Sequence, residues 1–232
     1  WARQNNCPWN EEICANAAYG GHLHVLQWVR ENGCPWDETT CLSAAENGHL
    51  HVLQWAHQNG CPWDEDVCVA AAEFGNLTIL EWIRQNNCPW NEWTCAYAAK
   101  EGHLHVLQWA RENGCPWTEK TCDFAASNGH LHVLHWATTN GCPWDEFICD
   151  RAFEGEEYHV VQWLIKNGAT LNTSYKTTTH YLFKHLNALE WLHNHQNFFK
   201  ETNLTQVISA INTTLLNNVW IPDIVKLIKT YI

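Results

Sequence analysis

Cysteine is the residue type in this chain whose number and spacing most readily suggest chemistry. The 12 cysteines fall into six pairs of the form C-x6-C, such as Cys34/Cys41 and Cys61/Cys68. Thiols in regular pairs can form disulfides, bind zinc, or fill a core as small apolar side chains. Which of these applies depends on the elements that carry the pairs.

Three interpretations of the cysteine pairs follow from their residue type. We favour reduced and buried thiols, because free cysteine is among the most buried residue types. A disulfide within each repeat is the alternative, since the pairs are complete and the total is even. Zinc is least favoured, because two thiolates leave a tetrahedral site short of ligands and C-x6-C is not a usual spacing. We therefore predict no metal and no cofactor.

Histidine also recurs regularly, in H-x-H pairs such as His22/His24 and His49/His51. Residues two apart on a helix point in different directions, so these pairs do not chelate a metal as H-x-x-x-H can. A column of histidines forming a pH-sensitive outer surface is the alternative interpretation. The chain also lacks a Gly-rich phosphate loop, a Ser nucleophile elbow and an isolated acidic pair, so we predict a non-catalytic protein.

The paired cysteines belong to a phrase that is repeated through most of the chain. Cys-Pro-Trp recurs every 27 residues, beginning at Cys7, Cys34, Cys61, Cys88, Cys115 and Cys142. A fixed period of this size predicts a solenoid, in which each unit contacts only its neighbours. Such a stack offers extended side faces, which are suited to binding other proteins.

Each repeat predicts two short helices joined by a turn. In residues 34–60, Asp37 is suited to cap the first helix and Gly48 to end it. The second helix is expected from about His49, with a broad apolar stripe, and ends at Gly60. The cap of the first helix recurs as Asn10, Asp64, Asn91, Thr118 and Asp145.

Two recurring residues outside the helices are expected to pack on them. Trp36 and Cys41 hold the two positions that touch in a hydrophobic staple at the start of the first helix. Cys61 follows the second helix and is expected to contact Ala56 or Trp55 at its end. The recurring residues of the phrase thus each have a structural task.

The phrase T-x-C-L-S-A-A-E-N-G-H-L-H-V-L at residues 39–53 resembles the ankyrin repeat, whose consensus includes T-P-L-H-x-A-A-x-x-G-H-L-x-V-V. The resemblance is close over residues 7–168 and weak over 169–232, and G-C-P-W-D-E is similar to shortened ankyrin repeats of protists, algae and giant viruses. It implies an all-α helix-turn-helix solenoid that binds proteins, with Cys41 at a core position. The family's unit has about 33 residues, so the shorter unit implies that its β-hairpin fingers are shortened or absent.

The repeat pattern divides the chain into an array and a C-terminal segment. Residues 1–6 form a partial repeat, and six full repeats extend to residue 168. Residues 169–232 are predicted to be two degenerate ankyrin-like repeats that cap the stack. The segment Ile221–Val225 has an alternative interpretation as the start of an F-box. The chain enters the pattern partway through a unit and contains no Met, so we expect that a preceding segment is missing.

Positions at which the copies differ indicate where a partner could bind. Counting from the Cys of each Cys-Pro-Trp, positions 6, 10 and 13 vary and lie on one face of the first helix. In ankyrin-like stacks this helix lines the concave side. Aromatic and basic residues, which are typical of binding hot spots, make up most of the candidates: Asn16, Tyr19, Trp93, Tyr97, Lys100, Lys120, Phe124, Phe147 and Arg151. The alternative is that diverging copies acquired different tolerated residues.

The charge of the chain restricts the class of partner. Its formal net charge is -12, and residues 1–168 contain 8 Lys+Arg against 22 Asp+Glu. Nucleic acid and anionic membrane are therefore not expected partners. No apolar run reaches about 18 residues and no signal-peptide pattern opens the chain. We expect a cytoplasmic protein, in the host cytoplasm or a virion if it is viral, and not a secreted one.

These observations predict a non-catalytic repeat protein that binds a protein partner through the variable face of its first helices. A structural component of a larger assembly is the first alternative, and a permanent contact of that kind should bury more than about 2,000 Å². A degradation adaptor is a further alternative, and it requires the F-box at the C-terminus to be real.

Overall fold

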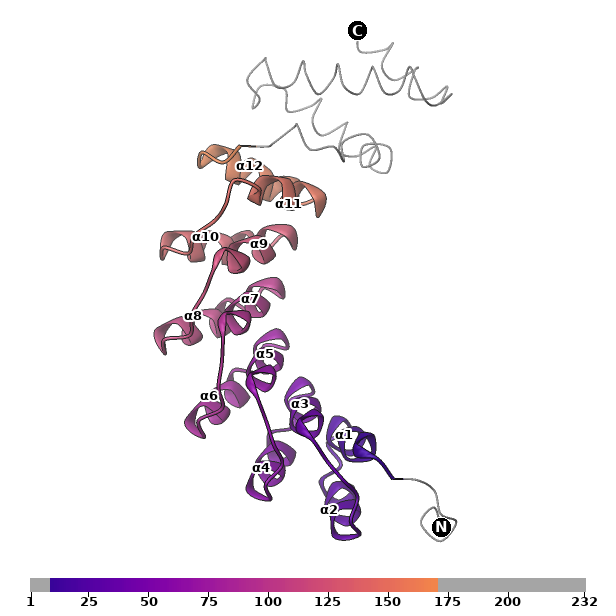
Figure 1. Ribbon diagram of the computed structural model, residues 1–232. Helices are drawn as coiled ribbons and strands as arrows, with labels where there is room; N and C mark the ends of the chain where they lie inside the picture. Colours follow the sequence, from indigo (N-terminus) through magenta and orange to yellow (C-terminus); the bar gives the residue numbers. More distant parts are fainter. Residues whose placement is uncertain (1–8, 171–232) are drawn as a thin grey trace, which may run out of the picture. The chain divides into compact units, whose positions relative to one another are not determined.

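The computed structural model describes residues 9–170, which form a series of α-helix pairs without any strand (Figure 1). The helices are α1 Glu11–Tyr19, α2 Leu23–Glu31, α3 Glu38–Glu46, α4 Leu50–Gln58, α5 Glu65–Glu73, α6 Leu77–Gln85, α7 Glu92–Lys100, α8 Leu104–Glu112, α9 Glu119–Ser127, α10 Leu131–Thr139, α11 Ile148–Glu154 and α12 Tyr158–Lys166. The predicted all-α architecture is confirmed, and no β-hairpin finger occurs in the described residues.

The chain divides into two compact units, residues 1–160 and 161–232. All helices from α1 to α11 belong to the first unit, and the boundary falls within α12. The predicted capping repeats and the F-box-like segment Ile221–Val225 lie beyond Thr170, outside the described residues.

Side-chain caps start the first helix in most copies, as the sequence predicts. The side chains of Asp37, Asp64, Asn91 and Thr118 each accept a hydrogen bond from the backbone N–H two residues further on, at 3.1, 3.0, 3.0 and 3.4 Å. Asn10 holds the N-cap position of α1 without such a bond. These caps satisfy N–H groups that have no partner within the helix.

The prediction for the sixth copy is wrong, because α11 begins at Ile148 with Phe147, and not Asp145, at its N-cap position. The Asp145 carboxylate still accepts the N–H of Phe147 at 2.9 Å. Both of its oxygens also bind the guanidinium of Arg151, at 2.7 and 2.9 Å. In this copy the Asp145 carboxylate binds both the backbone and Arg151, and the first helix α11 begins later than the first helices of the other copies.

Each second helix that precedes a Cys-Pro-Trp ends in the expected turn. After α4, the N–H of Cys61 donates to Ala56 O and the N–H of Gly60 donates to His57 O, both at 3.0 Å. This is the Schellman pattern, and Gly60 takes the positive φ of 81° that it requires. In the next copy Asn87 holds the same position at φ 63°, since Asn tolerates this region better than other non-glycine residues.

Within residues 1–160 the helix pairs stack in chain order along an arc (Figure 1). The first helices α1, α3, α5, α7, α9 and α11 lie on its inner side and contact one another closely, whereas the second helices lie on the outer side and contact one another little. Small residues permit the close approach, since Ala44, Ala45 and their equivalents are buried. The first helices therefore line the concave side, as predicted.

All of the cysteines in residues 9–170 are free and buried thiols. They meet in pairs that differ from the C-x6-C pairs of the sequence: Cys41 is hydrogen-bonded to Cys61, at the end of the next helix. Cys61 Sγ in turn donates to Asp37 O at 3.3 Å. Equivalent chains occur at Cys14/Cys34, Cys68/Cys88, Cys95/Cys115 and Cys122/Cys142. Each chain joins the end of a second helix to the start of the first helix of the same pair.

The tryptophans pack on one another along the second helices. Trp36 meets Trp55 at a ring-centroid distance of 5.8 Å, and similar pairs recur at Trp9/Trp28, Trp63/Trp82, Trp90/Trp109 and Trp117/Trp136. The Arg30 guanidinium of the preceding pair lies 4.0 Å above the Trp36 ring and also donates to Cys34 O. This cation–π contact joins neighbouring repeats on the outer side.

The histidines that open the second helices also join neighbouring repeats. His49 Nε2 lies 3.0 Å from Tyr19 O, and His51 Nε2 lies 3.3 Å from Gly21 O. In the third copy Asn76 replaces the histidine, and its Nδ2 donates to Ala45 O at 3.1 Å. No three His, Cys, Asp or Glu side chains of residues 9–170 are grouped so that they could hold a metal ion.

The buried thiols predict a loss of stability at alkaline pH. Burial, followed by hydrogen bonding to Cys34, raises the pKa of Cys14 to about 12, and the hydrogen bond to Cys61 raises the pKa of Cys41 well above its usual range. The unfolded chain therefore ionises first, so the stabilisation is complete below about pH 8.5 and declines above it. We expect the free energy of unfolding to fall by up to about 1.4 kcal/mol per pH unit for each such thiol.

Urea unfolding under reducing conditions between about pH 7 and pH 10 measures this slope. The matched variant Cys41→Ala/Cys61→Ala should show a shallower slope, because it removes the Cys41 thiol together with the partner that raises its pKa. A free energy that stays constant above pH 9 would contradict the assignment of these thiols as buried and protonated.

The left-handed turn after each second helix gives a separate prediction. The chain supplies a natural comparison, because Asn87 holds the position of Gly60 in the next copy. No atom lies within 4 Å of a Cβ placed on Gly60, so only the positive φ opposes a side chain there. Gly60→Ala should lower the unfolding free energy by about 1–2 kcal/mol. Gly60→Asn should cost less, because Asn87 adopts the same turn. Equal losses in thermal or urea unfolding would contradict this account.

Candidate functional site

Three of the predicted partner-binding residues form one cluster on the concave side. Trp93 and Tyr97 lie one turn apart on α7, and Phe124 lies on α9 of the next repeat. The ring centroids are 6.2 Å apart for Trp93–Tyr97 and Trp93–Phe124, and 5.8 Å apart for Tyr97–Phe124. The Trp93 side chain remains 39% exposed. We call these three residues the aromatic cluster.

The position of Trp93 follows from the start of its helix. The Asn91 side chain caps α7 by accepting the N–H of Trp93 at 3.0 Å, which fixes the backbone at that residue. The aromatic partners then orient the ring, since Tyr97 and Phe124 contact it from the same helix and from the next repeat. The cluster is therefore ordered before any partner arrives.

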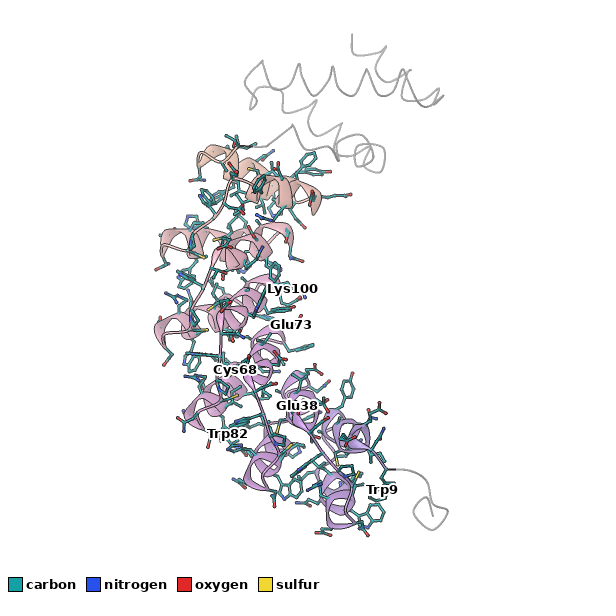
Figure 2. The ribbon with its side chains drawn as sticks, in the orientation of Figure 1. Trp9, Glu38, Cys68, Glu73, Trp82 and Lys100 are labelled. Atoms are coloured by element: carbon teal, nitrogen blue, oxygen red, sulfur yellow. The ribbon has the colours of Figure 1, made fainter. Side chains whose placement is uncertain are left out.

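Lys100 lies beside the aromatic cluster in an ion pair. Its Nζ is 2.8 Å from Glu73 Oε1 on α5 and 3.3 Å from Glu101 Oε1. Figure 2 shows Lys100 and Glu73 on the neighbouring helices α7 and α5. Nζ also lies 4.9 Å from the centre of the Tyr97 ring. The hydrogen bond to Glu73 raises the pKa of Lys100 above its usual range. Lys100 therefore stays charged, and the Glu73 carboxylate balances its charge within the chain.

The two other predicted cations bind a carboxylate that sequence reasoning missed. Arg151 Nη1 lies 2.7 Å from Asp123 Oδ1, and Lys120 Nζ lies 3.5 Å from Asp123 Oδ2. The Asp123 side chain is only 2% exposed. Burial raises the pKa of Asp123, although Arg151 opposes this shift. The hydrogen bond from Arg151 lowers the pKa of Asp145. Arg151 thus joins α11 to α9.

A signal for Asp123 exists in the sequence. It holds position 9, where the first four copies have Ala15, Leu42, Val69 and Ala96. These apolar residues are half-buried or buried. The change to a carboxylate at such a position indicates an ion pair, and Arg151 in the following copy supplies the cation.

The remaining predicted residues lie on α1 and at the start of α11. Asn16 and Tyr19 are exposed on α1, three repeats before α7, and Tyr19 is 58% exposed. Phe147 is half-buried at the N-cap position of α11. Asn16 and Tyr19 share the series of first helices with the cluster, but the structure does not bring them together with it.

The outer side of the array carries a hollow that the sequence did not indicate. It has a volume of about 430 Å³ and lies against α6, α8 and the connector that leads into α7. Its lining consists of Glu81, Arg84, Gln85, Trp90, Trp109 and Asn113. Arg84 lies 4.0 Å over the Trp90 ring, so part of this lining belongs to the contact between repeats.

Comparison with known proteins agrees with this architecture. Residues 95–138 match the family described as ankyrin repeats (many copies). The crystal structure of the human ASB11 ankyrin repeat domain aligns with a TM-score of 0.55 and 14% sequence identity, over 68% of this chain and 85% of that one. No curated protein matches the chain.

The stacked helix pairs define a helical solenoid with the fold of an ankyrin repeat domain, and residues 95–138 match the ankyrin-repeat family. The predicted resemblance is therefore confirmed. Repeats of this class generally mediate protein–protein interaction. None of the helices in residues 9–170 combines the length and the apolar character that a membrane-spanning helix needs. The similarity to repeats of protists, algae and giant viruses stays a prediction.

The Asp123 ion pair predicts a pH-dependent loss of stability in a variant. Arg151→Ala should lower the unfolding free energy at pH 7 by about 2–3 kcal/mol, because it leaves a buried carboxylate without its closest cation. Without Arg151 the folded-state pKa of Asp123 should rise further. Its protonation should then restore part of the stability as pH falls from 7 towards 5.

Lys120→Ala is the graded control, because Lys120 is more exposed and lies further from Asp123. Its loss should stay below about 1 kcal/mol. Urea unfolding of both variants at several pH values distinguishes them, and a loss for Arg151→Ala that is independent of pH would exclude the proposed role of Asp123.

Proposed function

We propose that this protein binds a protein partner through the concave face of its first helices, with the aromatic cluster at the centre of the contact. The observation that carries the proposal is the packing of Trp93 against Tyr97 and Phe124 while 39% of its side chain stays exposed. Large aromatic side chains held in this way are typical binding hot spots.

The order of the cluster supports the same conclusion on energetic grounds. Binding costs free energy when mobile side chains must be fixed. Here the rings contact each other and Lys100 before binding, so less side-chain entropy is lost. The mechanism is the rigid presentation of a few side chains by a stack of repeats, without any chemical step. The structural-assembly and F-box alternatives find no support in the comparisons.

Affinity capture from a native lysate of the source cells tests this proposal. Proteins captured by the unmodified chain should be reduced at least about tenfold with Trp93→Ala/Tyr97→Ala, which removes two expected hot spots. Trp28→Ala is the matched control, since it removes a 53% exposed indole from the second helix α2. It should capture the same proteins as the unmodified chain.

Far-UV circular dichroism and thermal unfolding should show that all three proteins remain folded. Recovery of the same proteins in the same amounts by Trp93→Ala/Tyr97→Ala would remove the aromatic cluster from consideration as the binding site.

A further inference from the structure

The cations on the concave face are already paired within the chain. Positions 6, 10 and 13 of the first helices in residues 9–170 include the cations Lys100, Lys120 and Arg151. Lys100 binds Glu73, and the other two bind Asp123. Each of these cations is therefore paired with a carboxylate of the chain, with Asp123 shared between Lys120 and Arg151, and none is left over to attract an acidic partner.

Several carboxylates of the same face, in contrast, have no such partner. Glu12, Glu46 and Asp66 hold positions 6 and 13 in the first three copies, and none of them forms an ion pair within residues 9–170. The helices α1, α3 and α5 contain no Lys or Arg. Burial, together with the neighbouring Glu73, raises the pKa of Glu46, which is the effect of a carboxylate that lacks a cation.

The chain itself shows how a cation is held on this surface. Lys100 lies between the Glu73 carboxylate on α5 and the Tyr97 ring on α7, at 2.8 Å from the first and 4.9 Å from the centre of the second. Glu46 holds the position of Lys100 two copies earlier, on α3, and Glu73 holds it between them. Along position 13, the residue therefore changes towards the aromatic cluster from an acid without an ion pair (Glu46), to an acid in an ion pair (Glu73), to the cation of that pair (Lys100).

We propose that the partner contacts this face with a basic segment that also carries an aromatic or large apolar residue. This inference rests on the proposed function and names the chemistry of its partner. The apolar residue lies on Trp93 and Phe124, and Lys or Arg side chains lie over Glu46 and Asp66. Charge complementarity of this kind sets partner choice and raises the association rate.

The spacing of the helices sets the length of that segment. Neighbouring packed helices lie about 8–10 Å apart, so α3 and α9 are separated by about 30 Å. An extended chain covers this distance in about nine residues. An acidic segment would meet uncompensated carboxylates at one end of the face, and a nucleic acid or anionic lipid surface would be repelled in the same way.

A displayed library of random 12-residue peptides, selected on the full chain, provides the test. Selected sequences should be enriched in Lys and Arg next to an aromatic residue, relative to the unselected library. Synthetic copies should bind Glu46→Gln/Asp66→Asn about five- to tenfold more weakly, because two ion pairs are lost. Binding should also weaken between about 50 and 300 mM salt.

The matched control is Glu31→Gln/Glu112→Gln, which removes two exposed carboxylates from the second helices α2 and α8. Its affinity for the peptides should be unchanged. A selection that gives no basic enrichment, or peptides that bind both double variants equally well, overturns this inference.

Trp93→Ala/Tyr97→Ala separates this inference from the proposed function. Peptides that lose affinity for this variant but show no basic enrichment leave the aromatic cluster as the binding site and refute only the partner chemistry. Peptides that bind this variant as well as the unmodified chain refute both.

Discussion

The close contact between neighbouring first helices is the constraint on which the rest of this structure depends. Buried alanines such as Ala44 and Ala45 let the helix axes approach, while the bulkier second helices touch one another little. The difference bends the array towards its first helices. The variable positions on these helices are consequently gathered on one inner surface, where residues from successive repeats become neighbours.

The same constraint explains why the first and second helices of a repeat contact their neighbours in different ways. The second helix cannot hold its neighbours by close backbone packing, so polar and aromatic contacts join the repeats on that side. Arg30 over Trp36 and His49 against Tyr19 O are examples. Residues that recur in most copies therefore maintain the stack, and the first-helix surface is free to vary. Ordered rings and unpaired carboxylates can accumulate there without disturbing the fold.

The sequence predicts the local features of the fold well, because caps and turns depend on residues that are close in the chain. Asp37 and Gly60 act as expected for this reason. The partner of a buried thiol is harder to predict from the sequence. Cys34 is closer to Cys41 in the chain, but Cys41 is hydrogen-bonded to Cys61, which it meets when the two helices of the pair pack together.

The candidate site shows the same limit. The aromatic cluster follows from helical spacing plus the repeat period, so Trp93, Tyr97 and Phe124 could be grouped in advance. The role of Arg151 could not be inferred without Asp123, whose burial depends on how α9 and α11 pack together.

The tryptophan pairs, most of which meet edge to face, have an optical consequence. Two indoles held about 6 Å apart couple electronically, and each pair exists only while its own helix pair is closed. The array therefore contains a chromophore pair in almost every unit. Near-ultraviolet dichroism and the depolarisation of tryptophan emission would report how many units remain stacked, so fraying from either end could be followed without any added label.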